Sequence, residues 1–418
     1  MKVLISAAET SSDAHGAELL KALRSEWTLR RGVTEEVAAR EIDAFGIGGP
    51  RLRQAGLRVL VDARDLLAMG FLEIIGHLPK ILRALRVVDA ASRREKPDLA
   101  IVIDYPDFHF RLARRLRAQG IPVIYFIPPK VWAWRKGRIR ILKELFSKIL
   151  CILPFEEEFY RQENVPATYV GNPLVDELPV DLSREDARGR LNISLSEKVL
   201  LLMPGSRASE LKRHLELFLE GALNCADSLA QSGVRGPLKV LIPFAGTANL
   251  PEVTARITAW SASQKDLEKL LSIRVSQNDS AVCMLAADAG LIKSGTSTLE
   301  AGFLGCPHCI IYKTNWITAW IFKFLIRYQG PVGLVNLVYG WTPGKPYLVQ
   351  EILLEAATAR SLGAEALQLF SDEKLRLKLL TGFEKLRKIL LAPQLTSGKG
   401  PSRQAAREIL EFMERTHP

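Results

Sequence analysis

The residues from Ala289 to Pro307 contain the clearest candidate for an anion-binding turn. An apolar run over 289–292 predicts a buried strand, and apolar residues at helical spacing follow Thr296. A turn between a strand and a helix presents free backbone N–H groups, and the helix dipole there favours negative charge. Hydroxyl side chains around Gly295 add donors from Ser294, Thr296, Ser297 and Thr298. The sequence therefore predicts an anion site in this turn.

Glu300 lies one helical turn further on and has two interpretations. Its carboxylate could accept hydrogen bonds from a ribose diol. Ser297 and Glu300 also have the spacing of a capping box, in which the glutamate accepts from the backbone N–H of the cap residue. Periodicity alone leaves both interpretations open.

A second turn of the same kind follows the apolar run over 199–203. Gly205, Ser206 and Arg207 then lead into a helix that begins near Glu210. Arginine can hold a phosphate group through two parallel hydrogen bonds. A cation at a helix N-terminus opposes the helix dipole, so a bound anion explains Arg207 better than a solvent-exposed helix start does.

A candidate general base follows the apolar run over 99–103, which predicts a central parallel strand. Asp104 comes directly after this strand, and ligands of doubly wound sheets bind outside the carboxyl ends of the strands. Capping of the next helix is the alternative role for Asp104. Glu9 is the rival base, whereas His15 falls in a predicted helix and His109 follows a predicted helix start.

The repeated order of strand, loop and helix predicts an α/β fold with doubly wound sheets. The 418 residues are enough for two domains that each bury a full core. Residues 174–197 are polar and contain prolines, as a linker with a short helix would be. We therefore place an N-terminal domain at 1–173 and a second domain at 174–400. Residues 391–403 are predicted to form a loop before a final helix within 401–418, with packing of that helix back on the first domain left open.

The net charge of +11 indicates an anionic partner, which could be nucleic acid, an anionic membrane surface or a phosphorylated substrate. A bilayer-spanning helix needs roughly 18 or more apolar residues, and no such stretch occurs. Glu9 and Asp13 interrupt the first apolar run too early for a signal peptide. We therefore expect a cytosolic protein, either free or resting on a membrane.

The five cysteines are sparse and odd in number, which argues against a disulfide framework. Cys306 and Cys309 form a CxxC pair. Redox pairs of this kind lie at the start of a helix, where the dipole lowers the thiol pKa. This pair instead follows a predicted helix and leads into a predicted strand, which disfavours a redox role. No further ligands for zinc are visible nearby.

Residues 66–91 combine a dense apolar patch with basic side chains. The patch runs from Leu67 to Leu78 and is followed, past Pro79, by a helical apolar stripe. A basic amphipathic segment can lie in a membrane interface, but an ordinary helix covering a sheet has the same pattern, and the pattern alone favours the ordinary helix. The basic residues beside the stripe are Lys80, Arg83, Arg86, Arg93 and Arg94.

Trp132 and Trp134 stand beside Arg135 in another aromatic and basic segment. Such residues could bind nucleic acid by stacking and phosphate contact. We rank this function lower, because the segment is short and no RNA-binding signature accompanies it.

These stretches together resemble the lipid A disaccharide synthase family, which consists of inverting GT-B glycosyltransferases. The matching patterns are Met-Gly-x-x-Glu-x-x-Gly from Met69, Val-Trp-Ala-Trp-Arg from Val131, Pro-Gly-Ser-Arg from Pro204, Ser-Gly-Thr-x-Thr-Leu-Glu from Ser294, and an asparagine before leucine at Asn336. The chain departs from the family pattern where Ala8 and Ser12 replace glycines, Pro128 replaces a serine and Tyr347 replaces a glutamate.

The resemblance implies two Rossmann-like, doubly wound domains facing a cleft, the first on the acceptor and lipid side and the second binding a UDP-sugar. It implies transfer of 2,3-diacylglucosamine from UDP to 2,3-diacylglucosamine 1-phosphate, which forms a β-1,6 disaccharide. Asp104 or Glu9 would be the base. The implied UDP-binding residues are Gly205, Ser206, Arg207, Glu210, Ser294, Gly295, Thr296, Thr298, Glu300, Asn336 and Gln350. The implied acceptor and lipid contacts are Met69, Phe71, Ile74, Trp132, Trp134 and Arg135.

No cofactor and no metal are expected, because no Asp-x-Asp motif occurs and arginine with backbone N–H groups would neutralise the diphosphate. The acylated substrates imply a cytoplasmic protein held peripherally on the inner membrane, with a homodimer left open. Two other classes are kept: a UDP-sugar 2-epimerase of the same architecture, and a non-catalytic basic protein that binds nucleic acid.

Overall fold

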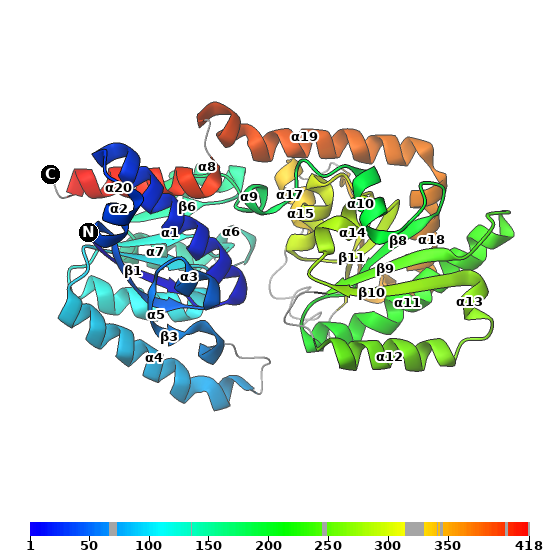
Figure 1. The fold of residues 1–418 in the computed structure, drawn as a ribbon, viewed down its shortest axis with the longest axis horizontal. Helices are drawn as coiled ribbons and strands as arrows, with labels where there is room; N and C mark the ends of the chain where they lie inside the picture. Colours follow the sequence, from blue (N-terminus) through cyan, green and yellow to red (C-terminus); the bar gives the residue numbers. More distant parts are fainter. Residues whose placement is uncertain are drawn as a thin grey trace. The chain divides into compact units, whose positions relative to one another are not determined.

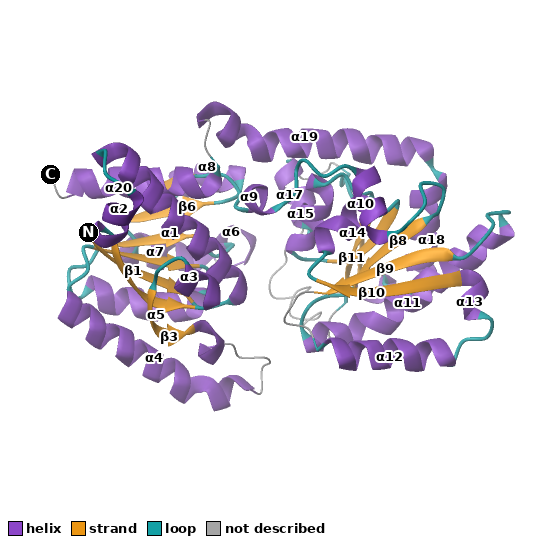
Figure 2. Ribbon diagram, in the orientation of Figure 1, coloured by secondary structure: helices purple, strands orange, loops and turns teal. Residues whose placement is uncertain are grey.

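The computed structural model describes residues 1–66, 73–134, 136–244, 249–313, 330–340, 342, 346–397 and 400–416. The chain divides into two compact units (Figure 1). One comprises Met1–Asp176 with Leu390–Pro418, and the other comprises Glu177–Ile389. Each unit is an α/β fold in which helices flank a single sheet (Figure 2).

The first unit contains a parallel seven-stranded sheet in the order β3-β2-β1-β4-β5-β6-β7. The strand order reverses between β1 and β4, which is the switch point of a doubly wound sheet. The strands are β1 (Lys2–Ala7), β2 (Asp43–Gly48), β3 (Arg58–Asp62), β4 (Leu99–Ile103), β5 (Val123–Phe126), β6 (Lys148–Cys151) and β7 (Ala167–Tyr169). β4 is buried along its whole length, as its unbroken apolar sequence predicts.

Side chains that alternate along these strands supply two cores, one on each face of the sheet. Val3 and Ile5 pack with one core and Leu4 with the other. The helices of this unit are α1 (Thr10–Arg31), α2 (Glu35–Glu41), α3 (Pro50–Gln54), α4 (Glu73–Glu95), α5 (Pro106–Arg117), α6 (Val131–Trp134), α7 (Ile139–Leu145), α8 (Pro154–Gln162) and α9 (Leu174–Glu177), with short 3-10 turns η1 (Ala63–Leu66) and η2 (Lys136–Arg138).

The last helix, α20 (Pro401–Thr416), packs against α1 in the first unit. Ala405, Ile409 and Met413 recur at helical spacing and are buried in the same core as α1. Arg403 pairs with the buried carboxylate of Glu26 at 2.9 Å. The end of the chain therefore completes the hydrophobic core built by its beginning.

The second unit contains a parallel six-stranded sheet in the order β10-β9-β8-β11-β12-β13. The strands are β8 (Val199–Met203), β9 (Leu238–Phe244), β10 (Leu271–Gln277), β11 (Ala289–Lys293), β12 (His308–Tyr312) and β13 (Glu351–Leu353). Its switch point lies between β8 and β11. The two doubly wound sheets confirm the fold class predicted from the sequence.

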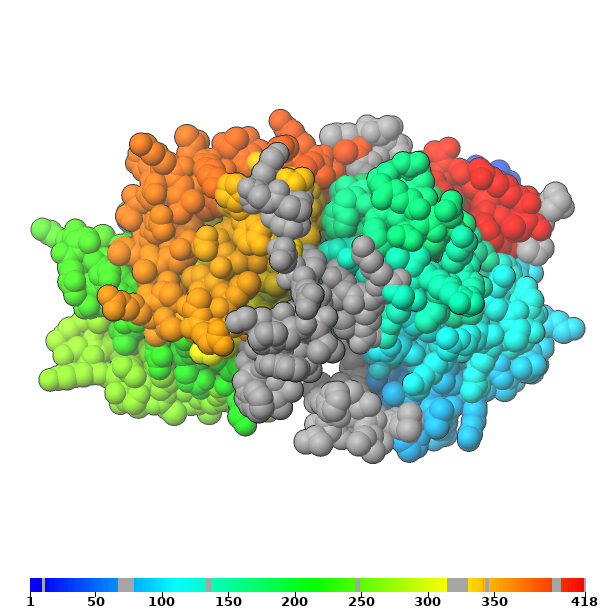
Figure 3. All heavy atoms as spheres, turned by 180° about the vertical axis from the view of Figure 1, so that it is seen from behind, coloured from blue at the N-terminus to red at the C-terminus, as the bar shows by residue number. Residues whose placement is uncertain are grey.

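The helices of the second unit cover both faces of its sheet. Those that the structure describes are α10 (Arg184–Leu191), α11 (Ala208–Gln231), α12 (Leu250–Ala262), α13 (Leu267–Leu270), α14 (Ser280–Ala286), α15 (Thr296–Phe303), α17 (Leu334–Tyr339), α18 (Ala359–Ser371) and α19 (Glu373–Ser397), with the turn η4 (Leu354–Ala356). Of α19, the residues up to Ile389 belong to this unit. α18 and α19 form part of the outer surface of this unit (orange in Figure 3). The helix α19 continues to Ser397, so the prediction of a loop over 391–403 was wrong for most of that range.

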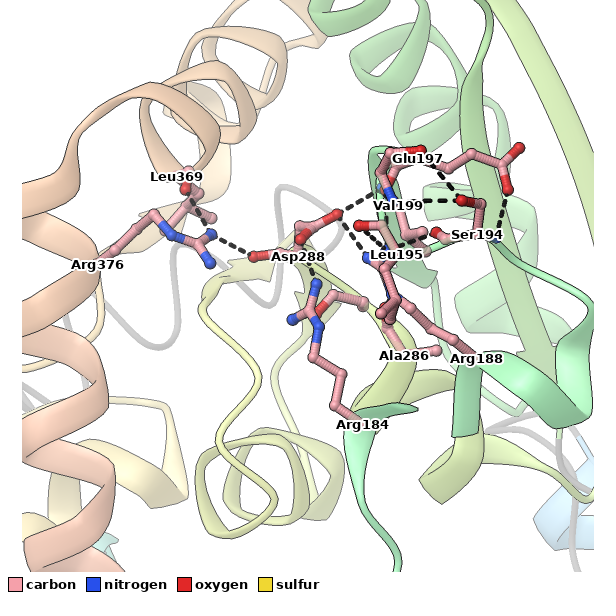
Figure 4. A network of polar contacts seen from close by, with 12 residues as sticks. Arg184, Arg188, Ser194, Leu195, Glu197, Val199, Ala286, Asp288, Leu369 and Arg376 are labelled. Carbon is pink, nitrogen blue, oxygen red and sulfur yellow. Dashed lines mark hydrogen bonds and ion pairs between the residues drawn. The ribbon is translucent and has the colours of Figure 1, made fainter. Parts of the chain in front are cut away.

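A buried charge network fixes the start of the second unit (Figure 4). The Arg188 side chain is 1% exposed, pairs with Asp288 at 2.9 Å, and donates to the backbone oxygens of Ser194, Leu195, Glu197 and Ala286. Asp288 also pairs with Arg184 and accepts from Val199 N. A buried charge is tolerated when it is paired and its hydrogen bonds are satisfied. The segment predicted to be a linker is thus partly an integral piece of the fold.

Candidate active site

The turn after β4 holds its backbone in an unusual conformation. Asp104 and Tyr105 both have positive φ, at 54° and 46°, although neither is glycine. Each such residue costs about 1–3 kcal/mol and persists only where its surroundings enforce it. α5 begins directly afterwards at Pro106. The chain therefore accepts strain to place an aspartate at this strand end.

Two buried side chains enforce that conformation through one backbone oxygen. His109 Nδ1 donates to Asp104 O at 2.5 Å, and the Tyr125 hydroxyl donates to the same oxygen at 2.9 Å. His109 Nε2 must then accept from Ser6 Oγ, 2.8 Å away, because a carbonyl oxygen can only accept. Burial lowers the pKa of His109 to about 4, so the ring is neutral and both its nitrogens are used. His109 positions the turn and is not free to act as a base.

The two candidate bases lie at neighbouring strand ends. β1 pairs with β4 in a register that aligns Ala7 with Ile103, so Glu9 and Asp104 follow adjacent strands at the switch point. Glu9 is the N-cap residue of α1. The pKa of the Tyr105 hydroxyl is raised, first by burial and then by the charges of Glu9 and Asp107. This effect of its charge indicates that Glu9 lies near Tyr105. This edge of the sheet therefore brings two carboxylates close to one strained turn.

Asp13, from the same loop motif as Glu9, has a structural role. Its buried carboxylate accepts from the backbone N–H groups of Gly49, Arg51 and Leu52 at 2.6, 3.0 and 3.1 Å, which caps α3. A Cβ on Gly49 would lie 2.6 Å from Asp13 Oδ2, so glycine is required there. Ser12, which replaces a family glycine, lies inside α1, where a helical backbone needs no glycine.

Trp132 is anchored from α8. Its indole Nε1 donates to Glu156 Oε1 at 3.0 Å, and its ring meets Phe155 edge-on at 4.9 Å between centroids. Glu156 is buried, also accepts from Leu153 N, and has its pKa raised to about 7 by that burial. The indole N–H is thus used inside the fold. Met69, Phe71 and Arg135 and the side chains of Ile74 and Trp134 lie outside the described part of the chain.

In the second unit, Glu210 closes the turn that follows β8. Its Oε2 accepts from Ser206 N at 3.0 Å and Arg207 N at 3.4 Å, and its Oε1 pairs with Lys293 Nζ at 2.8 Å. Burial alone would raise the pKa of Glu210, but the Lys293 contact and the two N–H donors lower it overall. Glu210 therefore occupies the anion position of this turn. The Arg207 side chain is exposed and forms no ion pair within the described residues.

Gly205 makes this closure feasible. It has φ of 124°, and a Cβ there would lie 2.6 Å from Glu210 Oε2. Any other residue would displace the carboxylate and strain the backbone.

The turn after β11 is open by comparison. Gly295 is the N-cap residue of α15, and the backbone N–H groups of Thr296 and Ser297 have no partner among the described residues. Thr298 is buried and its Oγ1 donates to Gly295 O at 2.9 Å, while Ser294 Oγ donates to Val332 O at 2.9 Å. The hydroxyls of Ser294 and Thr298 thus hold the turn in shape, and its outward donors are backbone groups.

The capping-box interpretation of Ser297 and Glu300 is wrong. Because Gly295 is the cap, Ser297 lies within the helix and Glu300 is too far along it to cap. Glu300 is partly buried, and its carboxylate forms no hydrogen bond or ion pair with any described residue. Burial first, and then the charge of Glu177, raise its pKa to about 7. An unpaired carboxylate beside an open anion turn is available to a ligand.

Asn336 and Glu351 organise the loop that packs on this turn. Asn336 is buried. Its side-chain Nδ2 donates to Val349 O and Glu351 Oε1, and its Oδ1 accepts from Val349 N, each at 2.9 Å. Glu351 also accepts from Val332 N and Gly333 N. With its amide used in this way, Asn336 is better interpreted as a positioning residue than as a ligand contact. Gln350 is exposed, and among the described residues its side chain donates only to Glu351 O, at 3.4 Å.

Sequence reasoning missed Lys293, Glu351 and the roles of His109 and Tyr125. A carboxylate at the start of a buried strand was the available signal for Glu351, which begins β13.

Cys306 and Cys309 are buried, and burial raises the pKa of both thiols, to about 12 for Cys306. This agrees with the argument against a redox role.

Two further observations concern the described residues. These residues contain no cluster of three or more metal-ligating side chains. No helix among them is long and apolar enough to cross a membrane. The second unit can bind an anion next to a carboxylate that accepts hydrogen bonds, and the first unit can offer a proton acceptor.

The fold is that of enzymes built from two doubly wound sheets. The UDP-GlcNAc 2-epimerase from Neisseria meningitidis, solved bound to UDP-GlcNAc, superposes with a TM-score of 0.59 at 14% identity, covering 95% of this chain and 99% of that one. A glycosyltransferase from Rickettsia africae superposes with a TM-score of 0.54 at 11% identity, covering 99% of this chain and 98% of that one.

The chain belongs to the lipid-A-disaccharide synthetase family, whose model matches residues 3–392. The lipid-A-disaccharide synthase of Myxococcus xanthus is 34% identical over 412 residues, which cover 99% of this chain and 97% of that protein. The enzyme of the same name from Anaeromyxobacter dehalogenans is 35% identical over 414 residues, with the same coverage. The family suggested by the sequence motifs is thereby confirmed.

Proposed function

We propose that this protein transfers 2,3-diacylglucosamine from UDP to 2,3-diacylglucosamine 1-phosphate, forming the β-1,6 lipid A disaccharide and UDP. Family membership supports the reaction. The observation that carries it is the pair of neighbouring turns after β8 and β11. They gather Arg207, open backbone N–H groups and the Glu300 carboxylate, which has no partner among the described residues, at one sheet edge. These groups suit a diphosphate and a ribose diol.

The proposed chemistry is a single displacement with inversion. A carboxylate of the first unit takes the proton of the acceptor hydroxyl while the oxygen of that hydroxyl forms a bond to the anomeric carbon. The bond between that carbon and the diphosphate oxygen breaks, and its electron pair leaves with UDP. Arg207 and the N–H groups of Thr296 and Ser297 stabilise the developing charge without a metal.

We assign the base to Asp104 rather than Glu9. Glycine or asparagine would adopt the conformation of residue 104 more readily, yet an aspartate is held there by His109 and Tyr125. Strain of this kind collects at functional sites. Glu9 has ordinary extended backbone angles at the N-cap of α1, so no backbone strain marks its position.

We also propose that the first unit rests peripherally on an anionic membrane surface through α4. Ala84, Leu85 and Val88 of this helix pack into the core, while Leu82 and Val87 are each 37% exposed. Both sequence-based interpretations of this segment therefore have support, because one face covers the sheet and the other carries apolar and basic side chains. The exposed basic residues are Lys80, Arg83, Arg86, Arg93 and Arg94.

Vesicle sedimentation tests the membrane proposal. Arg83→Glu with Arg86→Glu should weaken binding to anionic vesicles, by about 1 kcal/mol for each lost basic residue. A matched pair on α19, Lys374→Glu with Lys378→Glu, has the same charge change on another surface and should leave binding close to normal. Equal loss in both pairs would mean that net charge alone, and not α4, decides binding.

UDP release in detergent with both acylated sugars tests the reaction. We expect release only when donor and acceptor are both present. A 2-epimerase would instead convert UDP-N-acetylglucosamine alone, and a nucleic-acid-binding protein would show salt-dependent oligonucleotide binding without UDP release.

A further inference from the structure

The helix N-terminus that follows β8 already contains an anion from its own chain. The Glu210 carboxylate lies against the backbone N–H groups of Ser206 and Arg207, and its other oxygen contacts Lys293 Nζ at 2.8 Å. Both side chains of the ion pair are less than 20% exposed, at 18% for Lys293 and 17% for Glu210. The pair therefore belongs to the interior of the turn and not to its solvent-facing surface.

The surroundings hold this pair rigidly. His214, one turn further along α11, donates from Nδ1 to Glu210 O at 2.8 Å and accepts from Lys313 N at 3.2 Å. Burial lowers the pKa of His214, which keeps the ring in the neutral form that these two bonds require. The start of α11, which follows β8, is thus bonded to the last residue of β11 and to the residue after β12.

The turn after β11 differs in having no internal anion. The N–H groups of Thr296 and Ser297 are open among the described residues, and a Cβ on Gly295 would approach only Lys293 O, at 3.9 Å. Lys293 directly precedes this open turn while its ammonium group reaches the closed one. It is the covalent and electrostatic link between the two turns.

We propose that Glu210 and Lys293 form a positioning pair that closes the start of α11 to phosphate and directs the diphosphate of UDP to the start of α15. In this arrangement Glu210 does not contact UDP. It fixes the backbone of Ser206 and Arg207, and with it the position from which the exposed Arg207 side chain reaches the diphosphate. This inference rests on the proposed function, because it takes UDP as the ligand, and it replaces the sequence-based expectation that Glu210 binds UDP directly.

A double-mutant cycle on UDP affinity distinguishes a positioning pair from a separate ligand contact. Lys293→Met and Glu210→Gln, singly and together, are compared by calorimetry with UDP alone. Loss of a charge-assisted contact should weaken UDP binding by about 10- to 150-fold in either single variant. The double variant should bind about as well as the weaker single variant, because residues in contact are non-additive by about 2- to 150-fold. Additive losses would show that Glu210 contacts UDP independently of Lys293 and would overturn the proposal.

A matched ion pair on the same helix provides the control. Arg256 pairs with Glu216 of α11 at 2.7 Å and also donates to Leu211 O at 3.2 Å, without contacting Glu210 or Lys293. Arg256→Gln with Glu216→Gln should leave UDP affinity within about threefold of normal. A loss as large as that of the Lys293 and Glu210 variants would overturn the proposal, because destabilisation of α11 in general would then explain both.

Two further measurements keep the result interpretable. If Lys293→Met does not fold by circular dichroism, Lys293→Arg retains the ion pair and should keep UDP affinity, and a loss in that variant would also count against the proposal. Because the double-mutant cycle measures only UDP binding, its result does not depend on whether the protein turns over the sugar substrates. A wild-type protein that binds UDP with this coupling but forms no disaccharide would refute the proposed reaction and leave the positioning pair intact.

Discussion

The turn after β4 and the turn after β8 both contain backbone with positive φ, but they use different residue types for it. Each follows a buried parallel strand and leads into a helix, and each needs positive φ. In the first unit Asp104 and Tyr105 adopt it despite their side chains, and His109 and Tyr125 hold the backbone in place. In the second unit Gly205 adopts positive φ without strain, and the Glu210 carboxylate occupies the space that a side chain at position 205 would need.

The difference indicates what each turn is for. Strain is tolerated where a side chain must stand at one point, as a proton acceptor must. Glycine is used where the backbone itself and a tucked-in partner form the site, as in anion recognition. The catalytic chemistry would then reside mainly in the first unit's side chains and nucleotide binding mainly in the second unit's backbone.

Asp104→Asn should have the largest effect and tests whether the turn after β4 serves catalysis. The amide keeps the shape but cannot take a proton, so turnover should fall by about 10²–10⁴-fold. UDP affinity, measured by calorimetry, should stay within a few-fold of normal because the nucleotide belongs to the second unit. Near-normal turnover would transfer the role to Glu9, and loss of UDP binding would make Asp104 structural.

Arg207→Ala should produce the converse result. A lost charge-assisted hydrogen bond to phosphate weakens UDP binding by about 10- to 150-fold. Melting temperature should be unchanged, because the Arg207 side chain is exposed and forms no ion pair with the described residues. Unchanged affinity by calorimetry would remove Arg207 from the site.

Gly205→Ala should show that the second turn depends on having no side chain. The new methyl group would meet Glu210 Oε2 at 2.6 Å in a backbone region that disfavours alanine, at a cost of about 1–3 kcal/mol. Urea denaturation measures that loss. Gly189→Ala in α10 has nothing within 4 Å and should be neutral or slightly stabilising. Equal effects from the two substitutions would contradict the packing argument.

Tyr125→Phe should loosen the first turn without removing its base. One of the two hydrogen bonds to Asp104 O is lost, which is worth about 0.5–1.5 kcal/mol. Turnover should fall by about 2- to 12-fold while UDP affinity is retained. A fall in stability with no change in turnover per folded molecule would show that the strained turn is not tied to catalysis.

The smallest effect concerns the pH dependence of UDP binding. The pKa of Glu300 is raised to about 7, mainly by burial, so the group is largely a neutral acid at pH 6 and a carboxylate at pH 8. Since the carboxylate is the better acceptor for a ribose diol, UDP affinity should rise with pH over this range, by tenfold at most. Glu300→Gln should remove that component, and the difference between the two titrations cancels the ionisation of UDP itself. Parallel titrations would leave Glu300 without a ligand role.

Much of this architecture follows from local sequence. Unbroken apolar runs over 99–103 and 199–203 specify central parallel strands, since side chains buried on both faces must all be apolar. Glycine, serine and arginine after such a strand identify an anion turn from residue type alone. Family motifs spread along the chain identify the family from the sequence alone.

Tertiary structure decided which polar groups remain free for a ligand. Glu210 and Lys293 are 83 residues apart in sequence and meet only because β8 and β11 are neighbours in the sheet. Asn336 has its amide used by residues 13 to 15 positions away, and Gly295, not Ser297, caps α15. Spacing along a chain shows which groups could bind, whereas long-range packing determines which of them are already bonded within the protein.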